Sequence, residues 1–234
     1  MKRLRLIPPI LIFLVVVGFG IFGATHRSTY TNLTAQPDYI QDFMVAELLE
    51  DVAQDFCEFQ AQELPNSPII ARVTPTSGLE PLCYTSRQQF LVQEVFTGEG
   101  LQAGQVIWIG DSAGAVLPGG NPDSVECGYV NIPQKGREYL VFLSGPVEVV
   151  DGFPTLPTYT LVSHPRYLVN PIFCYEDFGT TIVAPLQGLG TYVPYSQVST
   201  NEFFATSQEA LDAMLELKHT LLELYPKESG DMNT

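Results

Sequence analysis

The first part of the chain is a long apolar run. It extends from Leu6 to Ala24, contains two prolines and three glycines, and follows three basic residues, Lys2, Arg3 and Arg5. A basic flank before roughly 20 apolar residues is typical of a secretory signal or an N-terminal membrane anchor. We therefore expect residues 1–24 to form a signal anchor or signal peptide, with the rest of the chain outside the cytoplasm.

The end of this run favours an anchor over a cleaved signal. With Ala24 as the last residue removed, Phe22 would stand two positions before it, where cleavage requires a small side chain. Residues 25–37 are polar, are expected to form a stalk, and include a formal glycosylation sequon at Asn32. We predict an uncleaved, membrane-anchored protein, with a secreted protein as the alternative.

Residues 38–60 have the apolar spacing of an amphipathic helix. The apolar positions recur every three or four residues and are Ile40, Phe43, Met44, Leu48, Val52 and Phe56. The other face is acidic and carries Asp42, Glu47, Glu50, Asp51 and Asp55. We interpret this face as a solvated surface, with a calcium or partner site as the alternative.

The middle of the chain alternates between short apolar runs and turn residues. The runs cover residues 69–73, 89–96, 106–109, 139–143 and 158–162, and glycines and prolines separate them. Short β-rich segments bounded by turns, without helices between them, favour a small barrel or sandwich over a βαβ fold.

The C-terminal segment predicts one more helix. Residues 206–209 have the spacing of a capping box. The apolar stripe that follows consists of Leu211, Met214, Leu215, Leu221, Leu222 and Tyr225, and Pro226 ends it. The Gly/Pro/Tyr-rich residues 185–205 before this helix receive no assignment.

Composition limits the range of functions. The 234 residues are 45% hydrophobic and 16% charged, and the formal net charge is −15. This chain length allows one core with appendages. An acidic surface repels phosphate backbones and anionic lipid surfaces, so we expect no nucleic-acid partner.

Four cysteines lie beyond the membrane segment, at Cys57, Cys83, Cys127 and Cys174. An even number of cysteines outside the cytoplasm predicts two disulfides. A metal site requires closely spaced cysteines and histidines, which this sequence lacks, so we predict no metal and no cofactor. Free or reactive thiols remain an alternative.

The segment Gly110–Gly114 contains a G-x-S-x-G motif around Ser112. A nucleophile elbow requires a helix after the serine, but Pro118-Gly119-Gly120 prevents one. Neither His164 nor His219 is paired with Ser112 by any feature of the sequence. We therefore expect a turn after a strand and no catalytic residue, and keep an envelope serine hydrolase that uses Ser112 or His164 as the alternative.

The segment from about Cys57 to Ala184 resembles the NTR-like module shared by netrin C-terminal domains and tissue inhibitors of metalloproteinases. The motifs that carry the resemblance are Val95-Phe96-Thr97-Gly98, Gly104-Gln105-Val106-Ile107, Cys127-Gly128 and Gly136–Phe142, with Cys174 at the place of a later family cysteine. The resemblance implies a five-stranded OB-type barrel with flanking helices, tied by disulfides, that binds protein partners. The N-terminal Cys-x-Cys of the metalloproteinase inhibitors is absent, so this inhibitory mechanism is not implied.

The resemblance also implies a disulfide pattern. In the family, the cysteines equivalent to Cys127 and Cys174 bridge back to the N-terminal part of the module. This leaves two pairings open: Cys57–Cys127 with Cys83–Cys174, or Cys57–Cys174 with Cys83–Cys127. The pairing of Cys57 with Cys83 and of Cys127 with Cys174 is excluded on the same ground.

These patterns predict a mainly β protein with flanking helices. A five-stranded OB-like domain over 38–184, including the acidic helix, follows the membrane segment, and a loop with an amphipathic helix occupies 185–234. The function we expect is that of an extracytoplasmic binding module for a protein or cell-surface partner, without a small-molecule cofactor. A purely structural domain that holds its own helices near the membrane is a further alternative.

Overall fold

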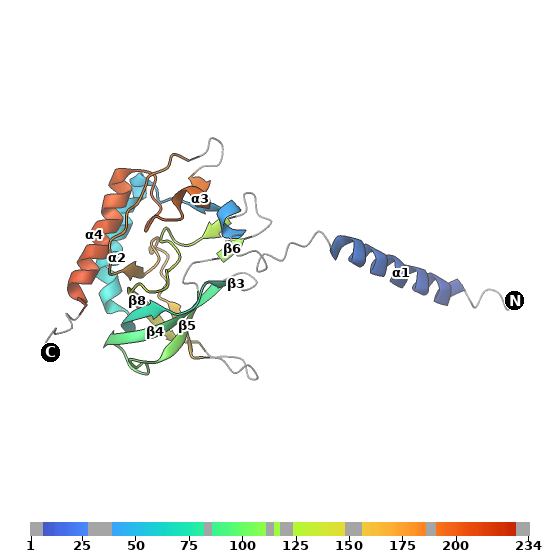
Figure 1. Ribbon diagram of the computed structural model, residues 1–234, viewed down its shortest axis with the longest axis horizontal. Helices are drawn as coiled ribbons and strands as arrows, with labels where there is room; N and C mark the ends of the chain where they lie inside the picture. The colour runs from blue at the N-terminus through green and yellow to red at the C-terminus, as the bar shows by residue number, and fades with distance from the viewer. Residues whose placement is uncertain are drawn as a thin grey trace. The chain divides into compact units, whose positions relative to one another are not determined.

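The computed structural model describes residues 7–27, 39–81, 86–110, 115–117, 124–147, 156–185 and 191–227. The chain divides into two compact units, Met1–Tyr39 and Ile40–Thr234. The first unit contains α1 (Ile7–Arg27), which Figure 1 shows as a single helix. Its apolar side chains from Ile12 to Phe22 are exposed. The sequence predicts a membrane segment here, but no helix among the described residues is long and apolar enough to cross a membrane.

The core of the second unit is a closed five-stranded barrel. Its strands are β2 (Ile69–Pro75), β4 (Ser86–Thr97), β5 (Val106–Gly110), β8 (Tyr139–Pro146) and β9 (Thr158–Leu161). They pair in the order β8-β2-β4-β5-β9, and β9 returns to β8. Only β5 and β9 are parallel within this ring. This arrangement is compatible with an OB-like fold, and the five predicted strands are confirmed.

Alternation of side chains along β4 explains how the barrel is filled. Phe90 and Val92 are buried, whereas Gln89, Leu91 and Gln93 between and beside them are partly exposed. Such a period-two pattern places one face of a strand in the core. Two additional strands border the barrel: β10 (Ile172–Cys174) pairs with β8, and β3 (Glu80–Pro81) pairs with β4.

A second, four-stranded sheet has the order β11-β1-β7-β6. Its strands are β1 (Met44–Ala46), β6 (Ala115–Leu117), β7 (Ser124–Glu126) and β11 (Tyr192–Pro194). The short helix α3 (Tyr195–Val198) follows β11. Thus part of the unassigned segment 185–205 contributes regular structure to the folded unit.

The predicted helix over 38–60 is correct only in its second half. A 3-10 helix, η3 (Tyr39–Asp42), and β1 precede α2 (Glu50–Glu63), which is followed by the 3-10 turn η4 (Leu64–Asn66). The backbone of β1 pairs with β11 on one side and with β7 on the other. These tertiary pairings outweigh the helical spacing of the side chains.

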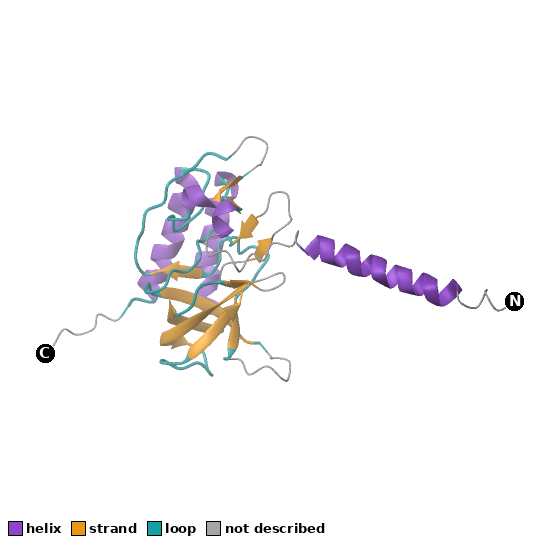
Figure 2. Ribbon diagram, turned by 45° about the vertical axis from the view of Figure 1, so that its right-hand side comes forward, coloured by secondary structure: helices purple, strands orange, loops and turns teal. Residues whose placement is uncertain are grey.

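Helices α2 and α4 (Gln208–Leu224) pack against each other and against the barrel (Figure 2). The cap of α4 is Ser207, whose hydroxyl accepts a hydrogen bond from the Ala210 N–H at 3.2 Å. Thr206, the first residue of the predicted capping box, instead donates to the Leu48 carbonyl at 3.0 Å. The start of the C-terminal helix is therefore also fastened to the segment between β1 and α2.

The predicted disulfide pairings are not formed among the described residues. Both require Cys57 to form a bridge, but Cys57 is a buried free thiol, as is Cys174. The reason is that Cys57 lies on the face of α2 turned toward α4, whereas Cys174 is part of β10. Burial raises the pKa of the Cys57 thiol to about 12, and the charge of Glu216 adds to this shift. Cys127 is likewise buried, and Cys83 lies outside the described residues.

Candidate functional site

The residues that the sequence offered for catalysis do not meet in one described site. Ser112 lies outside the described residues. The Nδ1 atom of His164 accepts a hydrogen bond from the Arg166 backbone N–H at 3.1 Å. This nitrogen is therefore engaged locally. His219 lies on α4, with Nε2 at 3.5 Å from Asp177 Oδ1.

The face on which OB-type barrels commonly bind ligands lies around the second and third strands, here β4 and β5. Its large aromatic side chain, Trp108, is nearly buried, and the Arg87 guanidinium stacks 4.1 Å from the ring centroid. Arg87 is held in turn by both carboxylate oxygens of Glu80, at 3.1 and 3.0 Å. The protein's own side chains thus cover this aromatic ring.

The better candidate is a half-open cavity beside α4, which we call the α4 pocket. Its volume is about 300 Å³. One wall comes from the segment after β10 and the other from α4. The lining residues are Asp177, Phe178, Gly179, Thr180, Glu202, Leu211, Leu215 and His219. A concave, partly apolar wall with a few converging polar groups is the usual form of a ligand site.

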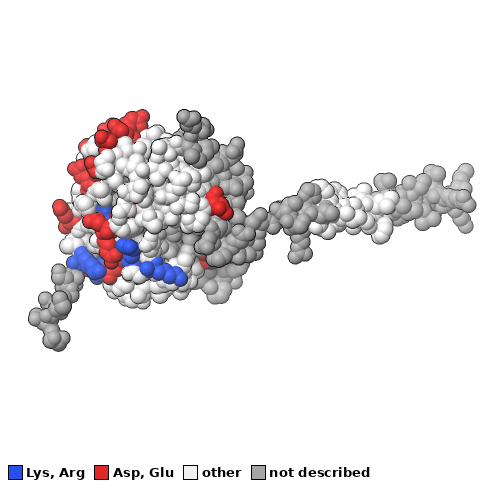
Figure 3. All heavy atoms as spheres, turned by 45° about the horizontal axis from the view of Figure 1, so that its top comes forward, with Lys and Arg blue, Asp and Glu red and all other residues white. Residues whose placement is uncertain are grey.

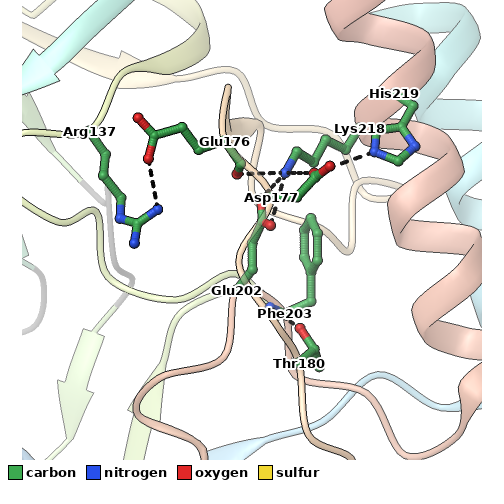
Figure 4. A network of polar contacts seen from close by, with 8 residues as sticks. All are labelled: Arg137, Glu176, Asp177, Thr180, Glu202, Phe203, Lys218 and His219. Carbon is green, nitrogen blue, oxygen red and sulfur yellow. Dashed lines mark hydrogen bonds and ion pairs between the residues drawn. The ribbon is translucent and has the colours of Figure 1, made fainter.

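The polar side of the α4 pocket is organised by Lys218, which is completely buried (Figure 4). Its Nζ atom donates to both carboxylate oxygens of Glu202, at 2.7 and 2.9 Å. It also donates to Asp177 Oδ1 at 2.8 Å and to the Glu176 carbonyl at 3.0 Å. Three N–H bonds shared among four acceptors satisfy the ammonium group, so it serves to position these oxygens.

The two carboxylates differ in their electrostatic environment. Burial raises the pKa of Glu202 above its usual value, against the opposing effect of Lys218. The hydrogen bond from Lys218 lowers the pKa of Asp177, which is largely exposed at the mouth of the pocket. Both hydrogen bonds to the Asp177 carboxylate run to Oδ1 in the described structure. Its Oδ2 atom can therefore accept from a ligand.

The apolar wall is held in place from behind. Phe178 lines the pocket, and the guanidinium of Arg137 stacks 4.3 Å from its ring centroid. The same arginine forms an ion pair with Glu176 at 3.0 Å. On the other wall, Leu215 is partly exposed. Phe178 and Leu215 thus provide hydrocarbon surface beside the Asp177 carboxylate.

These features determine which group the α4 pocket can accept. Asp177 and Glu202 carry two negative charges, Lys218 supplies one positive charge, and His219 adds a positive charge only when protonated. A net negative cavity with an apolar wall suits an aliphatic chain that ends in a cation. The described residues contain no cluster of three or more His, Cys, Asp and Glu side chains able to hold a metal ion.

No protein-family model matches the chain, and no curated protein matches it.

Sequence reasoning missed this pocket, although one signal for it was present. Lys218 stands inside the apolar stripe of the C-terminal helix, between Met214 and Leu221. A lysine at a core position requires buried acceptors, because an unpaired ammonium group is costly to bury. Which residues supply those acceptors depends on the tertiary structure, since Glu176 and Glu202 lie far apart in the sequence.

Proposed function

We propose that this protein is an extracytoplasmic binding module that takes a basic side chain of a partner protein into the α4 pocket. The observation that carries the proposal is the meeting of the Asp177 carboxylate with hydrocarbon surface in one half-open cavity. The resemblance to NTR-like modules, which bind proteins, agrees with this assignment and belongs to the proposal. The location outside the cytoplasm rests on the basic flank and apolar run at the N-terminus.

The recognition would use both ends of a lysine or arginine side chain. Its methylene groups would pack on Phe178 and Leu215, and its charged end would donate to Asp177 Oδ2. The net charge of −15 would favour the approach of a basic partner. Figure 3 shows acidic side chains along the upper left of the folded unit, which is the side where Figure 1 places α2 and α4.

Titration of the protein with n-butylammonium, a mimic of the lysine side chain, tests this proposal. We expect the methyl NMR signals of Leu211 and Leu215 to shift on addition of the amine. We expect little response to n-butanol, which has the same apolar chain without the charge.

Two variants locate the binding. Asp177→Asn removes the charge at the mouth of the pocket while keeping an acceptor for Lys218, and should weaken n-butylammonium binding about tenfold. Asp212→Asn changes an exposed carboxylate of α4 that does not line the pocket, and should leave binding intact. Equal binding by both variants, or equal binding of amine and alcohol, would contradict the proposal.

A further inference from the structure

A second surface hollow lies at the C-terminal half of α2, away from the residues of the α4 pocket. Phe59 of α2 contacts His164 and Tyr167 of the turn after β9, with ring centroids 5.3 and 6.1 Å apart. The rings of His164 and Tyr167 also contact each other, at 5.3 Å. We call Phe59, His164, Arg166 and Tyr167 the α2 patch. His164 and Arg166 are exposed and the other two are partly exposed, so aromatic surface faces the solvent here.

Arg166 contacts the aromatic rings of this patch through its guanidinium group. Its guanidinium carbon lies 3.8 Å from the centroid of Phe59 and 5.9 Å from that of Phe56. Within the described part of the chain, Arg166 takes part in no ion pair. The guanidinium is therefore positioned against the Phe59 ring, and its charge has no carboxylate partner among the described residues.

Hydrogen-bond acceptors surround the same hollow without contacting Arg166. The hollow has a volume of about 280 Å³, and Asp55, Glu58 and Gln62 line it together with Phe59 and Arg166. Neither Asp55 nor Glu58 forms an ion pair with any described residue. Glu58 accepts one hydrogen bond from Gln54, which leaves its second oxygen. Donors and acceptors thus stand side by side, too far apart to satisfy one another.

This arrangement selects the chemistry of a ligand. An anionic group would meet the carboxylates of Asp55 and Glu58, and a cationic group would meet Arg166. A hydroxyl group both donates and accepts, so a neutral polyhydroxyl ligand can satisfy both kinds of side chain. The C–H faces of a sugar ring can also pack on the exposed ring of His164 and the partly exposed ring of Tyr167.

We propose that the α2 patch and its hollow form a binding site for a neutral oligosaccharide, such as a segment of a surface polymer. His164 and Tyr167 contact the sugar ring, Arg166 donates to its oxygens, and Asp55 and Glu58 accept from its hydroxyls. This site shares no residue with the α4 pocket. The proposal can therefore be tested independently of the proposal that the α4 pocket binds a basic side chain.

NMR titration of the full chain with maltohexaose, cellohexaose and chitohexaose tests the proposal. At least one of these neutral oligosaccharides should shift the ring signals of His164 and Tyr167, with a Kd on the order of 1 mM or below. Absence of such shifts with all three would overturn the proposal. A proline hexapeptide is added as a separate ligand class, and a response to the peptide alone would also overturn it.

Matched variants place the binding. Arg166→Lys keeps the charge but loses the planar array of donors, and Asp55→Asn removes one acceptor charge; each should weaken the saccharide at least about threefold. Both positions are exposed, so the fold should be retained, and unchanged methyl signals in the core verify this. Glu209→Gln, an exposed change on α4, should have no effect. Equal saccharide affinity in all variants would show that binding occurs elsewhere and would contradict the assignment.

Discussion

The ammonium group of Lys218 is enclosed by protein oxygens from three residues. Two of them, Glu176 and Asp177, come from the segment after β10, and the third, Glu202, comes from the segment before α4. One side chain therefore fastens the C-terminal helix to two other parts of the chain. A buried pair of this kind contributes little net stability compared with apolar side chains, yet losing one partner is costly.

We predict that Lys218→Met will lower the free energy of unfolding by about 3–5 kcal/mol, because it leaves the Glu202 carboxylate buried without its cation. Urea unfolding at neutral pH measures this change. The double variant Lys218→Met/Glu202→Gln removes both charges and should recover most of the loss. A double variant as unstable as the single one would argue against this account.

Glu47 is a buried carboxylate of a different kind. It follows β1, only 2% of its surface is exposed, and its Oε2 atom has no hydrogen-bond partner among the described residues. Burial raises its pKa from 4.5 to about 7. The unfolded chain therefore loses this proton at a lower pH than the folded chain does.

The raised pKa of Glu47 predicts a pH-dependent stability. Below about pH 4.5 the carboxyl is protonated in both states and contributes no penalty. Stability should fall as the pH rises from about 4.5 to about 7, by up to about 3 kcal/mol, and then level off. Glu47→Gln should remove this component and be more stable than the parent above pH 7, as measured by urea unfolding at a series of pH values. Parallel pH profiles for the two proteins would contradict the prediction.

At the scale of elements, the exit from β4 depends on a single glycine. Gly98 has a φ of +108°, and a Cβ atom there would lie 2.6 Å from the Pro68 carbonyl oxygen and 2.7 Å from Ile69 Cγ1. The neighbouring strand β2 thus begins directly against the end of β4. This contact gives a physical reason for the glycine in the Val95-Phe96-Thr97-Gly98 motif.

We predict that Gly98→Ala will lower the free energy of unfolding by more than backbone strain alone would. Such strain costs about 1–3 kcal/mol, and the clash with Pro68 adds to it. Gly100→Ala is a matched control, since Gly100 also has a positive φ of +83° but no atom within 4 Å of the added Cβ. The difference between the two thermal unfolding midpoints measures the cost of the clash. Equal midpoints would mean that the positive φ angle alone causes the loss of stability and that the clash adds nothing.

The barrel strands were predictable because each is an apolar run bounded by glycine or proline. Strands such as β1, β7 and β10 were not, since three residues are too few to display a period. The residues of β1 were assigned to a helix because Phe43, Met44 and Leu48 have helical spacing. Only the pairing of β1 with β11 and β7 decides its conformation.

The candidate sites were less predictable than the fold. The α4 pocket combines residues near 177, 202 and 218, and the α2 patch combines residues near 59 and 166. Within α2, Phe56 and Phe59 have the three-residue spacing of apolar positions that face a core. The sequence therefore does not indicate that Phe59 is partly exposed. Arg166 follows a proline in a turn, where a basic side chain is ordinary. Tertiary structure alone brings these groups together.

For the folded unit as a whole, charge is distributed unevenly. The exposed charged residues of α2 and α4, apart from a protonatable histidine, are all acidic: Glu50, Asp51, Asp55, Glu58, Glu63, Glu209, Asp212, Glu216 and Glu223. The exposed Arg166 stacks on Phe59 of α2 and adds one positive charge to this side, whereas Arg72 lies in the barrel and pairs with Glu94 and Glu138. The helical side therefore presents a negative field to an approaching molecule, which supports the basic partner proposed for the α4 pocket.

The packing of α2 on α4 also constrains when the fold can be completed. Thr206 donates to the carbonyl of Leu48, which is 158 residues earlier in the chain. During synthesis from the N-terminus, at about 5–20 residues per second, α2 would wait on the order of ten seconds for its partner helix. Throughout that interval its apolar face is open to chaperones and proteases. The cover of α2 is therefore complete only after α4 has been made, and we expect a chain cut short before Gln208 to leave that apolar face exposed.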